Sequence, residues 1–160
     1  MCSITALLQA KGSADTARSQ ALEISKLQRH RGPDWSGVYQ NGGNVLVHER
    51  LAIVDVSSGS QPLIDPEHQV ALAVNGEIYN HQAIRKTTSN YPYQTGSDCE
   101  VILAIYREKG ADLVHDLEGM FAFVLFDPRD NSWLIARDSI GIIPLYFGHD
   151  KNGALLVASE

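Results

Sequence analysis

Residues 2–9 read CSITALLQ, an apolar and partly β-branched run that begins with a cysteine directly behind the first methionine. Such a run predicts a buried strand, which would hold the first residues of the chain in place instead of letting them fray. Because the side chain of Cys2 is small, we expect Met1 to be removed. Cys2 would then carry both a thiol and a free α-amine, whose pKa of about 7.7–8.0 suits the base that a thiol nucleophile needs. Taken alone, Cys2 is more simply a small residue without a chemical role, so a catalytic interpretation depends on motifs further along the chain.

The composition is that of an ordinary globular chain of 160 residues, 44% hydrophobic and 20% charged. This length provides one domain with a full hydrophobic core. The net charge is −6 and there is no basic cluster beyond Arg29-His30-Arg31, which argues against nucleic acid or an anionic membrane as a partner. No apolar run approaches a membrane span, and the first residues lack the order of a signal peptide. Two cysteines do not make a disulfide framework, so we expect reduced thiols and a cytoplasmic location.

Metal and phosphate motifs are absent from the sequence. The six histidines are scattered, and none pairs with another His, Cys or carboxylate at the spacing of a zinc site. No Walker-type phosphate loop and no Gly-x-Gly-x-x-Gly occurs. We therefore expect this chain to bind no metal and no cofactor.

Two strand-like runs, residues 35–40 and 44–54, are separated by Asn-Gly-Gly at 41–43, a strong hairpin signal. The segment before them, residues 30–34, contains Gly and Pro and is predicted to be a loop and nothing more. The second run carries Arg50. A charged residue in an apolar strand usually lies on a solvated face, but an arginine can also be a fixed fork for a carboxylate.

A third short strand, residues 69–74, runs directly into Asn75-Gly76-Glu77. Asn-Gly after a strand is most often a turn. It also offers an amide side chain and a backbone N–H that can converge on one point, which is the donor pair of an oxyanion hole. Glycine at the second position lets a ligand approach the backbone without a Cβ in the way.

Helical patterns cover residues 14–29, residues 80–86 and a segment that begins near Ser97. In the last of these, Ser97-x-x-Glu100 fits a capping box. Asp98 falls in its first turn, where the simplest role of a carboxylate is to face the helix dipole. Cys99 on the same helix is expected to be a small buried residue.

The last third of the chain consists of short strands joined by short turns, a pattern that predicts an antiparallel meander. Together with the helices that precede it, this pattern indicates the α+β class with helices layered on sheet. The four strands are residues 120–126, 133–136, 145–147 and 155–158.

These features together describe one pocket. A terminal cysteine can supply its own base, Arg50 can bind a carboxylate, and Asn75 with Gly76 can bind an oxyanion. Glu77 and Asp98 can bind an ammonium group. Such a pocket fits an α-amino acid with a carbonyl at the far end of its side chain, and glutamine meets that description.

Seven blocks carry a resemblance to a known family: MCSI at 1–4, RHRGPDWSGVY at 29–39, HERLAIVD at 48–55, LAVNGEIYNH at 72–81, TGSDCEVIL at 95–103, LEGMFAFVLFD at 117–127 and RDSIGIIPLY at 137–146. Over its whole length the chain resembles the glutaminase domain of bacterial glutamine-dependent asparagine synthetases. These are class II glutamine amidotransferases of the N-terminal-nucleophile hydrolase superfamily. The resemblance implies an αββα four-layer sandwich of two antiparallel sheets between helices, a fold that could be truncated at the C-terminus.

The resemblance also implies roles for single residues. Cys2 matches the nucleophile that attacks the glutamine side-chain amide, and Asn75 and Gly76 match the oxyanion hole. The matched substrate-binding positions are Arg50 for the carboxylate, Glu77 and Asp98 around the amino group, and Ile53 and Val54, which line the pocket through their backbone.

In the family the chain normally continues into an ATP-dependent synthetase domain that converts aspartate to asparagine. Residues 1–160 contain no Ser-Gly-Gly-x-Asp-Ser pyrophosphate loop, so they are expected to be a nearly complete glutaminase domain that cannot make asparagine unaided. ATP and magnesium would belong to the synthetase domain, which would be a partner, and the full-length enzyme could be a homodimer. Two alternatives stay open: an inactive fragment that binds glutamine, and the glutaminase domain of another class II amidotransferase.

Overall fold

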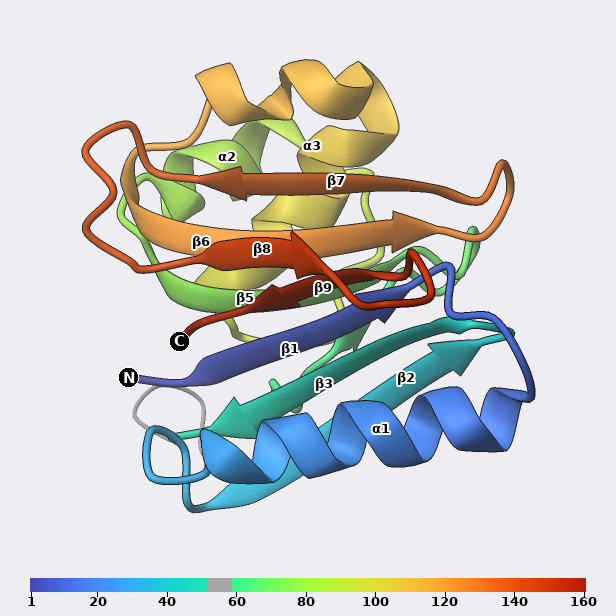
Figure 1. The fold of residues 1–160 in the computed structure, drawn as a ribbon. Helices are drawn as coiled ribbons and strands as arrows, with labels where there is room; N and C mark the ends of the chain where they lie inside the picture. The colour runs from blue at the N-terminus through green and yellow to red at the C-terminus, as the bar shows by residue number, and fades with distance from the viewer. Residues whose placement is uncertain (52–58) are drawn as a thin grey trace.

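Strand β1, Ser3–Leu8, lies at the centre of the molecule (Figure 1). The computed structural model describes residues 1–51 and 59–160. All six residues of β1 are buried, and the strand pairs antiparallel with β3 on one side and β9 on the other. The expected buried strand behind Cys2 is therefore confirmed, and neighbours on both sides hold the start of the chain.

In the described part of the chain, β1 belongs to a five-stranded sheet with the order β2-β3-β1-β9-β8. Strands β2, Trp35–Asn41, and β3, Asn44–Arg50, form the predicted hairpin, and Gly42 in its turn has φ +55°. Strand β3 ends at Arg50, and the expected end at Val54 falls in a segment that the structure does not describe. Residues 52–58 lie outside the described part.

A second antiparallel sheet packs against the first (Figure 1) and has the order β4-β5-β6-β7. Its strands are β4, Leu63–Ile64; β5, Ala71–Ile78; β6, Gly119–Asp127; and β7, Ser132–Arg137. The long central pair β5 and β6 is in register from Ala71 opposite Phe126 to Ile78 opposite Gly119.

Helices cover the outer faces of both sheets (Figure 1). Helix α1, Ala14–Leu27, lies on the first sheet, and the Ser13 side chain accepts a hydrogen bond from the Thr16 N–H at its start. The second sheet is covered by four short helices: α2, His81–Thr87; η1, Asp98–Glu100; α3, Val101–Lys109; and η2, Gly110–His115. Helix, sheet, sheet and helix form the predicted αββα sandwich. Within the described residues, no helix has the length and apolarity needed to cross a bilayer.

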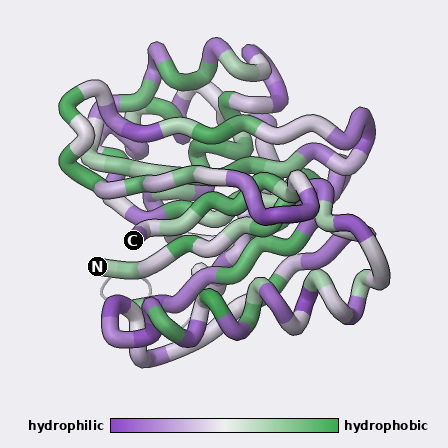
Figure 2. Tube along the Cα trace, viewed as in Figure 1, coloured by the Kyte–Doolittle hydropathy of each residue, from purple (hydrophilic) through white to green (hydrophobic). Residues whose placement is uncertain are grey.

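Three apolar clusters separate these layers. One lies between the two sheets and includes Ile4, Leu8, Val124 and Phe126. A second packs α1 against the first sheet, and a third packs the second sheet against its helices. Figure 2 shows hydrophobic residues following the central strands, while hydrophilic residues gather in the turns. The central strands β1, β5 and β6 are buried on both faces over most of their length, which is why they read as nearly continuous apolar runs.

The predicted C-terminal meander is confirmed for the antiparallel pairs β6–β7 and β8–β9 and is wrong for β7 and β8, which do not pair. Strands β6 and β7 pair in the second sheet, but β8, Tyr146–His149, and β9, Leu155–Ala158, belong to the first. The chain crosses between sheets after β7, where the Asp138 carboxylate accepts hydrogen bonds from the N–H groups of Phe121, Ile142 and Ile143. Short turns predict that consecutive strands pair with each other. Residues 138–145, which connect β7 and β8, are long enough for the chain to pass to the other sheet.

Candidate active site

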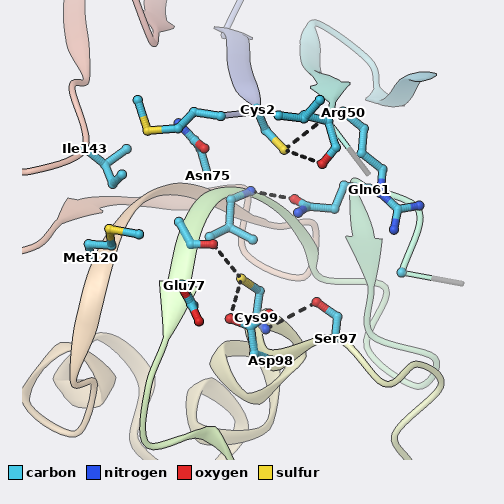
Figure 3. A pocket seen from close by; sticks show the side chains of 15 residues that line it. Cys2, Arg50, Gln61, Asn75, Glu77, Ser97, Asp98, Cys99, Met120 and Ile143 are labelled. Atoms are coloured by element: carbon cyan, nitrogen blue, oxygen red, sulfur yellow. Dashed lines mark hydrogen bonds between the residues drawn. The ribbon is translucent and has the colours of Figure 1, made fainter. Parts of the chain in front are cut away.

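A cavity of about 170 Å³ lies where the beginning of β1 faces the middle of β5 (Figure 3). An apolar cavity of about 150 Å³ can accommodate a benzene-sized molecule, so this one has room for a small side chain. Its lining comes from both sheets and from the turn before α3: Met1, Cys2, Arg50, Leu51, Gly59, Gln61, Val74, Asn75, Gly76, Glu77, Ser97, Asp98, Cys99, Met120 and Ile143.

Cys2 is half-buried at the edge of this cavity. Its sulfur accepts a hydrogen bond from the Leu51 N–H at 3.4 Å and lies 3.7 Å from the Leu51 carbonyl oxygen. These two contacts with one residue fix the position of the Cys2 side chain at the edge of the cavity. The main chain directly after β3 is therefore placed to support a nucleophile at Cys2.

The strand behind Cys2 is held by several groups from other elements. Ser159 accepts the Ile4 N–H through Oγ at 2.9 Å and donates its own N–H to the Ile4 carbonyl at 3.1 Å. The Gln28 amide donates to the Thr5 hydroxyl at 2.8 Å. Because these contacts lie within three residues of Cys2, they fix the position of its backbone.

Arg31 holds Cys2 itself, since its Nε donates to the Cys2 carbonyl at 3.2 Å. The prediction that residues 30–34 are a loop without a role missed this contact. The loop passes so close to β3 that a Cβ on Gly32 would overlap the Glu49 carbonyl. In the sequence, Gly32 was the residue that could indicate this contact. A glycine allows two backbones to pack closely, and this packing fixes where the neighbouring Arg31 side chain points.

Asn75 and Gly76 lie inside strand β5, so the expectation of a turn after Val74 is wrong. Asn75 is 2% exposed, and its Nδ2 has no hydrogen-bond partner within the described residues. Figure 3 shows its side chain directed toward the side of the cavity that carries Cys2. Gly76 has φ +147°, and a Cβ there would overlap the Met120 carbonyl. A buried amide donor without a partner is rare and marks a place where a ligand can accept.

The carboxylates of Asp98 and Glu77 line the opposite part of the cavity. Asp98 Oδ2 accepts the Ile78 N–H at 2.7 Å, which ties the turn before α3 to β5. Glu77 is exposed at the rim. The capping box is confirmed only in part: Ser97 Oγ accepts the Cys99 N–H, but the Glu100 carboxylate binds the Gln94 and Thr95 N–H groups instead of the Ser97 N–H.

The remaining predicted residues fall into two groups. Arg50, the last residue of β3, is buried and lines the same cavity. Ile53 and Val54 lie outside the described residues. The structure thus brings together in one cavity all six predicted residues that it describes: Cys2, Arg50, Asn75, Gly76, Glu77 and Asp98.

The cavity contains a second free thiol, Cys99, which is buried as expected. Its Sγ lies 3.8 Å from the Gly76 carbonyl and 3.7 Å from Asp98 Oδ2. Burial, and then the negative charge of Asp98, raises the pKa of the Cys99 thiol well above its ordinary value. Cys99 therefore stays protonated near neutral pH, which leaves Cys2 as the candidate nucleophile of this cavity.

Two further residues next to the oxyanion pair were missed. Gln61 Oε1 accepts the Val74 N–H at 2.7 Å, and His48 Nε2 lies 3.0 Å from the Val74 carbonyl. His48 is fully buried, and burial lowers its pKa to about 4, with the Val74 carbonyl opposing and Arg50 adding to the shift. A histidine inside an apolar strand looks like any half-exposed polar residue in the sequence, so no local signal identified it.

The buried imidazole of His48 predicts a specific acid instability. Between pH 6.5 and about 4 the unfolded chain protonates this histidine while the folded chain does not, so stability falls as the pH is lowered through that window. The loss relative to a His48→Gln variant should reach about 3 kcal/mol. Urea unfolding of both proteins at several pH values measures it. Parallel stability curves for the two proteins would contradict the burial of a neutral His48.

Among residues 1–51 and 59–160, no group of three or more His, Cys, Asp or Glu side chains is arranged to hold a metal ion.

The fold of this chain is shared with known enzymes. Two solved structures match 99% of the chain: a glutamine phosphoribosylpyrophosphate amidotransferase from B. subtilis, with a TM-score of 0.75 and 21% identity, and an allosteric regulatory enzyme of purine biosynthesis, with 0.76 and 22%. The chain covers 42% of each. At this identity the match shows the fold alone, which this chain shares with both enzymes.

The profile of the glutamine amidotransferase domain matches residues 1–160, and the chain belongs to this family. It is 56% identical over 161 residues to asparagine synthetase B (glutamine-hydrolysing) of Escherichia coli, and 50% identical over 160 residues to asparagine synthetase 1 (glutamine-hydrolysing) of Arabidopsis thaliana. Both matches include the entire chain but only 29% and 27% of the relatives. The chain therefore spans less than a third of the length of these relatives.

Proposed function

We propose that this chain hydrolyses glutamine to glutamate and ammonia through a γ-glutamyl thioester on Cys2. The observation that carries the proposal is the buried Asn75 amide, whose Nδ2 has no hydrogen-bond partner in the described part of the chain and whose side chain is directed toward the side of the cavity that holds Cys2 (Figure 3). A hydrogen-bond donor at this position can stabilise a substrate oxygen that becomes negatively charged only during the reaction. The chain's family and the names of its relatives support glutamine as the substrate.

Substrate recognition is explained by the charges around the cavity. The Arg50 guanidinium would bind the glutamine carboxylate, and the carboxylates of Glu77 and Asp98 would bind its ammonium group. Because the carboxylate and the ammonium group of glutamine are bonded to the same carbon, binding both of them fixes that end of the amino acid and leaves its side chain to extend toward Cys2. Ile53 and Val54 are proposed to contact the substrate through their backbone.

The reaction begins once Met1 has been removed. The α-amine of Cys2 takes the thiol proton, and the sulfur attacks the amide carbon of the glutamine side chain. The resulting oxyanion accepts hydrogen bonds from Asn75 Nδ2 and the Gly76 N–H. The α-ammonium returns the proton to the leaving nitrogen, ammonia departs, and a thioester remains. Water, deprotonated by the same amine, then attacks the thioester and releases glutamate and the free thiol.

We further propose that the ammonia supplies an ATP-dependent conversion of aspartate to asparagine. This step is suggested by the relatives, which are glutamine-hydrolysing asparagine synthetases. It would take place in a synthetase domain, where ATP and magnesium would act, while the glutaminase step needs no cofactor from residues 1–160. A cytoplasmic location is proposed, consistent with the free thiols of Cys2 and Cys99.

The direct test is incubation of the purified chain with glutamine. We expect glutamate and ammonia in equal amounts, and γ-glutamyl hydroxamate when hydroxylamine is present to intercept the thioester. Hydroxamate formation separates a covalent route from simple attack by water. A chain with Cys2 at its N-terminus that binds glutamine but releases neither product would support the alternative of an inactive binding module.

A further inference from the structure

The imidazole of His48 connects the two sheets next to the proposed oxyanion hole. His48 lies on β3, where it pairs with Ile4 of the nucleophile strand β1. Its Nε2 reaches across to the Val74 carbonyl of β5 at 3.0 Å. A carbonyl oxygen can only accept, so Nε2 carries the proton in this contact. The bonded carbonyl belongs to the peptide whose nitrogen is that of Asn75.

The pairing of β5 explains why a side chain is needed at this point. Strand β4 pairs with Ala71 and Leu72, and among residues 1–51 and 59–160 no strand continues this pairing along the edge of β5 beyond Leu72. Val74 directs its N–H and carbonyl to that open edge. Gln61 Oε1 takes the N–H at 2.7 Å and His48 takes the carbonyl, so two side chains continue the ladder that β4 leaves unfinished.

The environment of His48 argues against a purely structural role. Its side chain is fully buried, and its Nδ1 has no hydrogen-bond partner within the described residues. An imidazole with only one hydrogen-bonded nitrogen stabilises the fold less than an apolar side chain would. The reason is that a buried polar atom without a partner is unfavourable. An apolar side chain, however, could not bind the Val74 carbonyl and therefore could not fix the orientation of the Val74–Asn75 peptide.

We propose that His48 is a positioning residue for the reaction: by holding the Val74 carbonyl it fixes the Asn75 amide and the Gly76 N–H opposite Cys2. The proposal rests on the glutaminase function proposed above. It also explains why the oxyanion strand and the nucleophile strand, which belong to different sheets, keep one relative position at the cavity. His48 does not line the cavity and acts only through β5.

The test compares His48→Leu with His48→Gln in glutamine hydrolysis. In His48→Leu an Nδ1 that has no partner among residues 1–51 and 59–160 is exchanged for a Val74 carbonyl that has lost its partner, so the melting temperature should change little. We expect kcat to fall at least about tenfold with KM within about threefold, since the oxyanion donors act on the transition state. The amide of His48→Gln can donate to the same carbonyl and should restore kcat to within about threefold of the wild type.

Val47→Ala is the matched control. Val47 is the neighbour of His48 on β3, is equally buried, and packs in the cluster under α1 instead of against β5. It should lower the melting temperature and leave kcat unchanged. A His48→Leu chain with wild-type kcat, a change confined to KM, or a His48→Gln chain no better than His48→Leu would each overturn the proposal.

A measurement that needs no activity separates this inference from the proposed function. The ¹⁵N chemical shifts of the His48 ring in the intact chain report which nitrogen carries the proton. We expect a neutral ring with the proton on Nε2 near neutral pH. A proton on Nδ1 would overturn the role of His48 even in an active enzyme, whereas a wild-type chain without turnover but with the Nε2–H ring would count against the glutaminase function alone.

Discussion

Replacing Cys2 by alanine should abolish glutamine hydrolysis, with turnover lower by at least about 10⁴-fold. The expected effect is large because the proposed route forms its covalent intermediate on this sulfur. Its position is set by the Leu51 N–H at 3.4 Å and by Arg31, whose Nε holds the Cys2 carbonyl at 3.2 Å. Release of ammonia from glutamine under saturating conditions measures the change.

Cys2→Ser is the matched comparison, since it keeps the α-amine and replaces only the sulfur. It should still bind glutamine, as seen by calorimetry, yet turn over little, because a hydroxyl is far less readily ionised than a thiol. If Cys2→Ala instead retained a substantial part of the activity, water rather than sulfur would be the attacking group, and the thioester route would be wrong.

Replacing Asn75 by alanine should lower kcat by about 10²–10³-fold with a smaller change in KM, because one oxyanion donor is lost and the Gly76 N–H remains. The amide is 2% exposed, and its Nδ2 has no partner within the described residues, so no hydrogen bond from this nitrogen to a described group is lost. The melting temperature should therefore stay close to that of the wild type. Steady-state kinetics and thermal unfolding of the same preparation give both values.

Asn75→Asp gives a sharper control because it preserves the shape of the side chain. A carboxylate would face the developing oxyanion, so kcat should fall below that of Asn75→Ala. An aspartate variant that is as active as the wild type would show that Asn75 does not donate to the reacting oxygen, and the assignment of the oxyanion hole would have to be abandoned.

The sequence predicted those parts of the fold that depend on local patterns. The buried strand behind Cys2, the hairpin at Asn41-Gly42-Gly43 and the helix over residues 14–27 are explained by apolar periodicity and turn residues. The layered sandwich came from the family resemblance. The pairing of β8 with β9 follows from the short turn between them, but the pairing of β9 with β1, about 150 residues away along the chain, leaves no local signal.

The residues of the candidate site also divide into those that the sequence could identify and those that it could not. Residues that contact a ligand directly, such as Cys2 and Asn75, have side chains whose chemistry is visible in the sequence. Arg31, His48 and Gln61 act on backbone atoms of other strands, so their role depends on contacts that only the folded chain creates. Asn75 and Gly76 were expected in a turn. Pairing with β6 instead continues strand β5 as far as Ile78, so both residues lie in the strand.

The central claim is that Cys2, freed of Met1, is the nucleophile of this cavity. It is tested most directly by the intact mass of the purified chain before and after incubation with 6-diazo-5-oxo-norleucine, a glutamine analogue that alkylates such nucleophiles. We predict a chain without Met1 that takes up one adduct, mapped to Cys2 and absent from Cys2→Ala. A processed chain that stays unlabelled, or that is labelled at Cys99 instead, would contradict the account.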